Sequence, residues 1–563
     1  MSVIGIQRGH DAGLCLMRGG KVEIAVEAER VHRIKHADGP GTIPEAARIA
    51  FRQTALSAKG VDAVVIADSF RDRIEHALAP LTADMHGPGL LAPLGHYGAI
   101  REISDIGIAG IPADTPVLAA CHHACHAAGA IYMSGYDDAL VYAYDGWGVC
   151  AASVAYLYRD GRLTRLEDSV DRILIGWRYD LLAQFLAEIN ERNTRKYDYS
   201  GKLMGLSAYG TPRPEAVRRL KSWLRRDYED YKSSWSDSEK SWFPGLINEA
   251  GFTRDSSHAR DPDFQTLLAS LQLAMNQVVC EEVKSLAGQH QCRNVIVTGG
   301  CALNIVANDA LGELAGVERL FVPPNANDAG LAMGAAVIGA AYGEDSPLHF
   351  PHISRRERRS PFKGPHLLGR PSKSRRFKTT RPPGRAALDR VVEALMSGGM
   401  AGFVQGRMEI GPRALGHRSL LADAAAPDMR ETLNRRIKQR EWWRPFAPVV
   451  RSVDAERYFE ITRPCPYMLR TALIRAPWRD RLPAVAHVDH TARLQVLEDE
   501  AADPALWYVL SELERRRGIG VCLNTSLNLG GAPILNSHAE IHRFLDRTEL
   551  QFVYVDGAII ERA

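Results

Sequence analysis

The strongest constraint on the fold is a strand-rich start that occurs twice along the chain. Short apolar runs at residues 3–6, 13–17 and 22–26 follow one another around Gly-Gly turns, as consecutive strands do. A similar start follows near residue 115 or 139, and stretches with helical spacing lie between the apolar runs. The pattern predicts an α/β architecture, and 563 residues suffice for about three or four compact units.

A stretch rich in Arg, Lys, Pro and Ser divides the chain at about residues 343–386. It lacks the alternating aromatic and basic residues of a surface that stacks nucleic-acid bases. We interpret it as a solvated linker, with a patch for nucleic acid or an acidic partner as the alternative. The predicted organisation is an N-terminal domain at 1–345, a basic linker at 346–386 and a C-terminal domain at 387–563.

Charge and cysteine content exclude several classes of protein. Seventy Lys and Arg against 67 Asp and Glu give a net charge of +3, which provides no global field for nucleic acid or an anionic membrane. The nine cysteines are scattered, as in a reduced cytosolic protein. The N-terminus does not read as a signal peptide, and no apolar run approaches the roughly 20 residues that cross a bilayer. We therefore expect a cytoplasmic protein.

The densest group of reactive side chains is the segment CHHACH. Its residues His122 and His126 are four apart and so share one face of a helix, the spacing of a helical metal site. The flanking residues are small and would let another backbone approach, namely Ala119, Ala120, Ala127, Ala128 and Gly129. A zinc site that uses Cys121 and Cys125 is the weaker alternative, because these thiols point to a different face.

Two carboxylates follow predicted strands and add to this metal hypothesis. Asp145 ends an apolar strand, and Asp328 follows the strand at 320–322 and precedes a helix of small residues. Two imidazoles and two carboxylates would suit iron(II), manganese or zinc.

Glycine turns and a histidine give further candidates. Gly299 and Gly300 follow a strand and precede a helix that contains Asn304, so their N–H groups could face a phosphate. Lys202 is flanked by glycines in the segment 200–206, which otherwise reads as an ordinary turn. His10 lies between the first two strands, where it could act as a base or be a partly exposed turn residue.

Two C-terminal segments place arginines among glycine, proline and tryptophan, namely 406–419 (GRMEIGPRALGHRS) and 437–448 (IKQREWWRPFAP). Guanidinium groups at such turns suit bidentate binding of oxyanions, whereas a solvated face would not have these surroundings. The segment 521–535 predicts a strand, a polar turn and a second strand. Its candidates for phosphate or amide contacts are Asn524, Thr525, Ser526 and Asn528.

These segments together resemble the O-carbamoyltransferases. The resemblance rests on HDAG, CHHACH, YDGWG, GKLMGLSAYG, TGGCALN, PPNANDAG, RMEIGPRALGHRS, IKQREWWRPFAP and LNTSLN, which occur in this order over nearly the whole chain. That family includes enzymes of aminoglycoside, cephamycin and ansamycin biosynthesis and of nodulation-factor decoration.

The resemblance implies an actin-like ATPase N-terminal lobe, as in the enzymes that transfer threonylcarbamoyl groups to tRNA, and a YrdC-like C-terminal lobe. It implies that the C-terminal lobe makes carbamoyl adenylate from carbamoyl phosphate and ATP with Mg²⁺ and releases pyrophosphate. A hydroxyl of the acceptor then attacks the carbamoyl group in the other lobe, near Fe²⁺. The acceptor itself is not fixed by the resemblance, and we expect a hydroxylated secondary metabolite, such as an antibiotic precursor.

The resemblance also implies residue roles. The metal set falls on His122, His126, Asp145 and Asp328, and the base falls on His10. The adenylation set falls on Arg413, Lys438, Arg444, Arg493 and Ser526. Some relatives carry a basic residue where this chain has Asn528, which puts that contact in doubt. The acceptor pocket falls on Asp11, Lys35 and His36.

Three alternatives use related folds. The first is a carbamoyl or threonylcarbamoyl transferase acting on tRNA or protein, which the neutral net charge and the missing zinc-finger spacings disfavour. The second is an actin-like small-molecule kinase, which would need neither GPRALG nor the histidine pair. The third is a nucleotide-binding regulator without catalysis, which would release no pyrophosphate.

Overall fold

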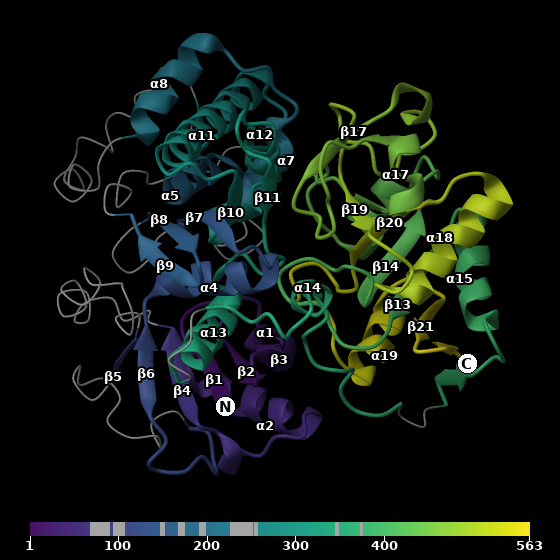
Figure 1. The fold of residues 1–563 in the computed structure, drawn as a ribbon. Helices are drawn as coiled ribbons and strands as arrows, with labels where there is room; N and C mark the ends of the chain where they lie inside the picture. Colours follow the sequence, from purple (N-terminus) through teal and green to yellow (C-terminus); the bar gives the residue numbers. More distant parts are fainter. Residues whose placement is uncertain are drawn as a thin grey trace. The chain divides into compact units, whose positions relative to one another are not determined.

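The computed structural model describes residues 1–67, 91–93, 107–146, 152–166, 175–190, 199–225, 252, 257–343, 348–371 and 375–563. They form two compact units, of which the first comprises Met1–Ala28 and His36–Arg359 and the second Glu29–Lys35 and Ser360–Ala563. In Figure 1 the first unit runs mainly from purple to teal and the second mainly from green to yellow. Helix α1 (Ala28–His32) begins at Ala28, the last residue of the range Met1–Ala28, and its other residues belong to the second unit.

The first unit contains two sheets that share a five-strand arrangement, to which the first sheet adds β5, antiparallel to β6. The first sheet has the order β3-β2-β1-β4-β6-β5 and the second has the order β11-β10-β7-β8-β9. In each, three consecutive strands form antiparallel hairpins, and two later strands add parallel to the first of them. The first unit is therefore a doubled α/β structure of the actin-like ATPase type, and the two similar starts predicted from the sequence are its two sheets.

The strands of the first sheet are β1 (Ser2–Gln7), β2 (Gly13–Arg18), β3 (Lys21–Glu27), β4 (Ala63–Ala67), β5 (Leu91–Pro93) and β6 (Val117–Ala120). Those of the second are β7 (Asp138–Tyr144), β8 (Ser153–Arg159), β9 (Arg162–Arg165), β10 (Asn294–Thr298) and β11 (Arg319–Phe321). The described helices are α2 (Ile43–Gln53), α4 (His122–Ser134), α5 (Ile175–Asp180), α6 (Ala187–Asn190), α7 (Tyr199–Ser207), α8 (Pro214–Leu224), α11 (Pro262–Gln289), α12 (Ile305–Gly312), α13 (Leu331–Gly343) and α14 (Arg355–Arg359).

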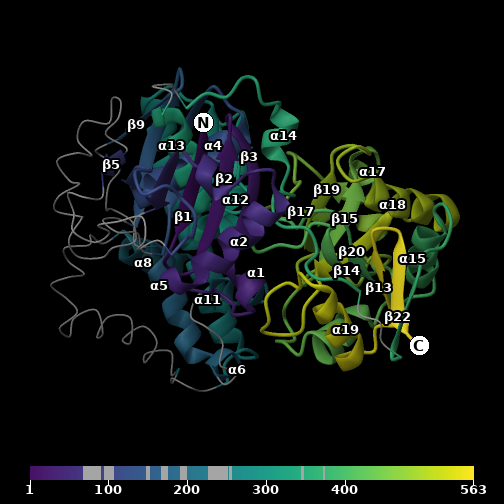
Figure 2. The ribbon, with the colours of Figure 1, turned by 90° about the horizontal axis from the view of Figure 1, so that it is seen from below.

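Helices α4 and α13 lie between the two sheets. Helix α13 packs on β1, β2 and β4, α4 packs on β7, β8 and β10, and the two helices contact each other (Figures 1 and 2). Their backbones approach so closely that a Cβ on Gly334 would lie 1.8 Å from the carbonyl oxygen of Cys125. This confirms the expectation that the small residues around CHHACH admit a second backbone.

The second unit is built on an eight-stranded mixed sheet with the order β12-β22-β21-β13-β14-β20-β15-β19. One face is covered by α15 (Ala386–Met396) and α18 (Pro504–Arg517). The other face packs against α19 (His538–Arg547), α17 (Ser452–Tyr458) and a small sheet of the order β16-β17-β18. Apolar clusters on both faces make this a three-layer α/β domain.

Its strands are β12 (Phe377–Thr380), β13 (Met400–Val404), β14 (Arg418–Asp423), β15 (Ala447–Arg451), β16 (Phe459–Glu460), β17 (Thr471–Ile474), β18 (Thr491–Arg493), β19 (Gln495–Leu497), β20 (Val521–Ser526), β21 (Phe552–Val555) and β22 (Ala558–Arg562). A short helix α16 (Met429–Thr432) continues into a π-helical turn, Leu433–Ile437. The second strand expected within 521–535 is absent from the described structure, where α19 follows β20 after an irregular segment.

The basic segment predicted as a linker contributes ordered structure to both units. Its helix α14 packs on α4 in the first unit, and β12 pairs with β22 in the second. Arg359 donates hydrogen bonds to the carbonyl oxygen of Ser134, and Arg355 donates one to that of Gly135, at the C-terminal end of α4. These arginines satisfy carbonyl groups that a helix leaves without partners, so this part of the segment is not simply solvated.

Among the described helices, none combines the length and the hydrophobicity that a membrane span needs.

Candidate active site

Helix α4 brings two buried imidazoles together in the first unit. The chain leaves β6 at Ala120, and the helix begins at His122, so both histidines lie in its first turns. The ring centroids of His122 and His126 are 4.8 Å apart, as the spacing of four residues predicts.

Asp145 reaches the same place from the end of β7. Its Oδ1 accepts hydrogen bonds from the backbone N–H of Gly146 at 2.7 Å and of Gly300 at 3.2 Å. The preceding Gly299 has φ of +91°, and a Cβ there would lie 2.1 Å from the carbonyl oxygen of Tyr144. The Gly299-Gly300 turn therefore holds the carboxylate, a role that the sequence analysis did not assign to it.

Asp328 completes the group from a 3₁₀ turn (Asp328–Gly330) that precedes α13. His126 Nε2 lies 3.2 Å from Asp145 Oδ2 and 3.4 Å from Asp328 Oδ1, and His122 Nε2 lies 3.3 Å from Asp145 Oδ2. One ligand atom from each of the four residues lies within 4.8 Å of the others. The structure thus brings together all four residues of the predicted metal set.

The electrostatics of this group fit a divalent cation. Burial alone would raise the pKa of Asp145, but hydrogen bonds from His122 and His126 hold it well below its usual value. Burial alone would lower the pKa of His126, but its contacts with Asp145 and Asp328 raise it to about 9. Buried carboxylates require a compensating positive charge, and two nitrogen and two oxygen donors at these distances are a suitable ligand set for iron(II), manganese or zinc.

A second layer of contacts surrounds Asp328. His10 Nε2 lies 3.1 Å from Asp328 Oδ2, and Asn327 donates a hydrogen bond of 2.9 Å to Asp11 Oδ2. The other oxygen of Asp11 lies 2.7 Å from His36 Nδ1, and the pKa of this carboxyl is lowered despite its burial. The predicted acceptor residues Asp11 and His36 are thus paired within the first unit, whereas Lys35 belongs to the second.

Two other candidates of the first unit, Asn304 and Lys202, lie in or next to helices. Asn304 caps α12 by accepting a hydrogen bond from the N–H of Ala307 at 3.0 Å, and it also pairs with Gln272. Lys202 is buried in α7, so the segment 200–206 is helical, not a turn. Trp147 and Gly148 of the YDGWG segment lie outside the described residues.

The second unit holds a cluster of basic residues, called here the cation cluster. Burial and neighbouring cations lower the pKa of Lys438, of Arg440 and of Arg493, each well below its usual value. The members that repel one another are Arg413, Lys438, Arg440, Arg444 and Arg493. Like charges that are desolvated together lose stability unless an anion compensates them, so the cluster is a candidate oxyanion site.

Ser526 and Asn528 both contact Lys438. The Nζ of Lys438 donates hydrogen bonds to Asn528 Oδ1 at 2.7 Å and to Ser526 Oγ at 3.3 Å. Lys438 directly follows the π-helical turn, a distortion that is frequent at functional sites, and Gln439 has a positive φ of 44°. Asn528, in doubt from the sequence, therefore contacts the predicted set. Asn524, by contrast, is bound to Gln495 at 2.7 Å within the core.

Arg440 was missed by the sequence analysis although it lies in a quoted segment. Its Nε donates a hydrogen bond of 2.7 Å to Asn434 Oδ1, and its guanidinium lies 4.2 Å from the ring centroid of Phe446. No local pattern separates it from the neighbouring arginines.

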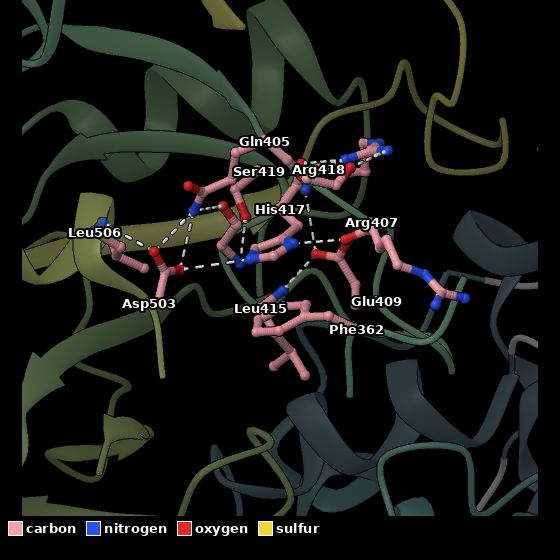
Figure 3. A network of polar contacts seen from close by, with 12 residues as sticks. Phe362, Gln405, Arg407, Glu409, Leu415, His417, Arg418, Ser419, Asp503 and Leu506 are labelled. Atoms are coloured by element: carbon pink, nitrogen blue, oxygen red, sulfur yellow. Dashed lines mark hydrogen bonds and ion pairs between the residues drawn. The ribbon is translucent and has the colours of Figure 1, made fainter. Parts of the chain in front are cut away.

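Arg418, in the GPRALGHRS segment, has a structural role. It donates hydrogen bonds to the carbonyl oxygens of Gln405 and His417 at 2.7 and 2.9 Å, and Glu409 Oε1 accepts from the N–H groups of Leu415 and Arg418 (Figure 3). These contacts fix the loop that carries Arg413.

His417 and the buried Asp503 lie beside each other in the same network, with 3.9 Å between Nε2 and Oδ2 (Figure 3). Burial lowers the pKa of His417 to about 3 and raises that of Asp503 to about 7. Both side chains are therefore neutral near pH 5.

Comparison with known proteins gives two family matches. Residues 106–337 match the model described as "Carbamoyltransferase N-terminus", and residues 392–562 match "Carbamoyltransferase C-terminus". Nodulation protein U of Rhizobium tropici is 30% identical over 94% of this chain and 91% of its own length. Nodulation protein NolNO of Sinorhizobium fredii is 27% identical over 98% of this chain and 79% of its own length.

Solved structures are more distant. The activator of 2-hydroxyisocaproyl-CoA dehydratase from Clostridium difficile is 14% identical with a TM-score of 0.34, covering 61% of this chain and 96% of its own. HypF from T. kodakarensis is 14% identical with a TM-score of 0.32, covering 64% of this chain and 49% of its own.

Proposed function

Because this chain belongs to the carbamoyltransferase family, we propose that it makes carbamoyl adenylate from carbamoyl phosphate and ATP and passes the carbamoyl group to a small-molecule hydroxyl. The observation that carries the proposal is the pair of sites that the chain builds: a cation cluster in the second unit and a four-ligand metal site in the first. The cation cluster suits polyphosphate chemistry, and the metal site suits transfer.

Adenylation belongs to the second unit, for which we retain the YrdC-like assignment. The β- and γ-phosphates of ATP leave as pyrophosphate, the phosphate of carbamoyl phosphate leaves as inorganic phosphate, and the exchange consumes one water. Arg413, Arg444 and Arg493 would neutralise the charge that develops on the phosphates, together with Mg²⁺. Their mutual repulsion supports this role, because bound ATP would remove it.

Lys438 would supply a further positive charge to the same phosphates. Its ammonium contacts Ser526 and Asn528, so these two side chains set its position and could exchange a contact with it for one with a phosphate oxygen.

Transfer belongs to the first unit. The ligands His122, His126, Asp145 and Asp328 would hold a divalent cation, for which we propose Fe²⁺. Such a cation supplies Lewis-acid stabilisation of charge on an oxygen. The Gly299-Gly300 turn, Asn304 and Lys202 remain proposed contacts of the adenylate.

His10 is the proposed base that takes the proton of the acceptor hydroxyl as the oxygen attacks the carbamoyl carbon and AMP departs. Its contact with Asp328 keeps the imidazole beside the metal ligands. Asp11 and His36, paired at 2.7 Å in the first unit, are proposed to line the acceptor pocket. A hydroxylated secondary metabolite, such as an antibiotic precursor, is the proposed acceptor class.

The test uses the full-length chain with ATP, Mg²⁺ and carbamoyl phosphate. We expect pyrophosphate release that depends on carbamoyl phosphate, and candidate alcohols should gain about 43 Da, the mass of an added carbamoyl group. ADP formation in place of pyrophosphate would indicate a kinase, and transfer to tRNA or protein alone would overturn the proposed acceptor class.

A further inference from the structure

A pocket in the second unit lies outside the residues assigned above, apart from Asn528 at its edge. It has a volume of about 160 Å³, and its apolar lining includes Leu529, Leu535 and Phe544. Three arginines line it: Arg33 from the segment Glu29–Lys35, and Arg543 and Arg547 from α19. The lining residues therefore come from segments far apart in sequence that fold into one unit.

The charges of the lining do not balance. Glu540 is the carboxylate of the pocket, and its ion pair is with Arg33. Arg33 also donates hydrogen bonds of 2.7 Å to the carbonyl oxygens of Pro533 and Ile534, and these contacts fix its position. Burial lowers the pKa of Arg33, and the nearby cations Arg30 and Arg543 lower it further.

Arg543 and Arg547 are the side chains of the pocket whose N–H groups can donate to a bound ligand. They are four residues apart on one face of α19, and both are exposed. Among the residues that the structure describes, neither forms a hydrogen bond or an ion pair. Three guanidinium groups and one carboxylate leave an excess of two positive charges, which matches a phosphate dianion.

The pocket has room for a small phosphate compound, since its volume of about 160 Å³ is well above what a single water needs. Asn528 borders the pocket and accepts the hydrogen bond from Lys438, so the pocket adjoins the cation cluster without including its arginines.

We propose that Arg33, Arg543 and Arg547 form a second phosphate site, which binds the dianion of inorganic phosphate or of a small phosphate compound such as carbamoyl phosphate. The site goes beyond the proposed function, because it uses none of the arginines assigned to adenylation. It would hold phosphate beside the cation cluster while ATP occupies that cluster.

The experiment is calorimetric titration of the full-length chain with inorganic phosphate. We expect Arg543→Gln combined with Arg547→Gln to lose one phosphate per chain, or to bind it roughly tenfold or more weakly. The matched control combines Arg435→Gln with Arg515→Gln, which removes two exposed arginines that pair with Glu431 and Glu512 away from the pocket. Phosphate binding that is the same in the double variant and the control would overturn the proposal.

A second arm identifies the source of the phosphate group. If carbamoyl phosphate displaces inorganic phosphate from the site that depends on Arg543 and Arg547, it is a ligand of the pocket; if it does not, inorganic phosphate is. Pyrophosphate release measured on the same preparations separates the two proposals. A wild-type chain that binds phosphate in the pocket but releases no pyrophosphate would refute the proposed function alone.

Discussion

His10 and Asp328 are joined by a contact of 3.1 Å between Nε2 of the imidazole and Oδ2 of the carboxylate, and Oδ1 of the same carboxylate lies 3.4 Å from His126 Nε2. One carboxylate therefore connects the proposed base to the proposed metal ligands. Substitutions on either side of Asp328 should separate the two roles.

His10→Asn should keep the polar contact with Asp328 and lose the ability to take up a proton. We expect transfer to the acceptor to fall by about 10²–10⁴-fold, the usual contribution of a general base, with metal content and pyrophosphate release unchanged. Product formation, bound metal and pyrophosphate are measured on one preparation. The control is His352→Asn, whose imidazole contacts the carbonyl oxygen of Gly19. Metal loss from His10→Asn would instead make His10 a ligand or a support for one.

His126→Ala should remove the metal, because it deletes one of four ligands and leaves two buried carboxylates with less compensation. We expect carbamoyl transfer to be lost and carbamoyl-phosphate-dependent pyrophosphate release to persist. Elemental analysis and the pyrophosphate assay check the two halves. A folded variant without pyrophosphate release would contradict the division of the reaction between the two sites.

Arg493→Gln should lower adenylation without lowering stability. A hydrogen bond to a charged group contributes about 1.5–3 kcal/mol, so pyrophosphate release should fall roughly tenfold to hundredfold. The same change relieves repulsion from Arg413 and Arg444, so the unfolding temperature should stay level or rise. Steady-state kinetics and calorimetry test this, with Arg435→Gln as the control. A loss of stability with unchanged kinetics would assign Arg493 a structural role.

Stability should respond to pH through His417 and Asp503 in opposite directions. The folded-state pKa of Asp503 is raised to about 7, so its contribution to the free energy of unfolding falls as the pH rises from about 4 to 7. The folded-state pKa of His417 is lowered to about 3, so its contribution falls as the pH decreases from about 6.5 to 3. Folding in effect moves one proton from His417 to Asp503, and between pH 4 and 6.5 the two slopes cancel.

Asp503→Asn mimics the neutral acid and leaves His417 uncompensated. The free energy of unfolding of this variant should rise by about 1.4 kcal/mol per pH unit between pH 4 and 6, relative to the wild type. Urea unfolding at three pH values measures it. Parallel pH curves for the two proteins would show that these groups do not titrate as described.

Arg359→Ala should destabilise the first unit. It removes the hydrogen bonds to the carbonyl oxygen of Ser134 and the guanidinium that lies 5.3 Å from the ring centroid of Phe321. We expect a loss of about 1–3 kcal/mol in chemical denaturation, with pyrophosphate release intact. Arg370→Ala, which removes an exposed arginine of the same basic segment, should cost almost nothing. Equal effects from both changes would return this segment to the role of a solvated linker.

Local pattern predicted those parts of the fold and the site that depend on local geometry. Strand alternation marked the two starts that became the two sheets, and the spacing of four placed His122 and His126 on one face of α4. Asp145 and Asp328 were found because each follows a strand, where a side chain leaves the sheet edge.

The parts that could not be predicted depend on contacts distant in sequence. Arg418 and Arg440 look alike in the sequence, but one binds loop carbonyl groups and the other joins the cation cluster. The Gly299-Gly300 turn was predicted only as a phosphate contact. Its contacts with Tyr144 and Asp145 could not be predicted, because these residues lie about 155 positions earlier in the chain. Only the folded chain shows which partners such residues meet.

Formation of carbamoyl adenylate is tested by measuring pyrophosphate release from ATP by the purified full-length chain, with and without carbamoyl phosphate. We expect release only when carbamoyl phosphate is present, to the same extent in the wild type and in His126→Ala. Intact ATP in the presence of carbamoyl phosphate, or release of ADP in place of pyrophosphate, would contradict this expectation.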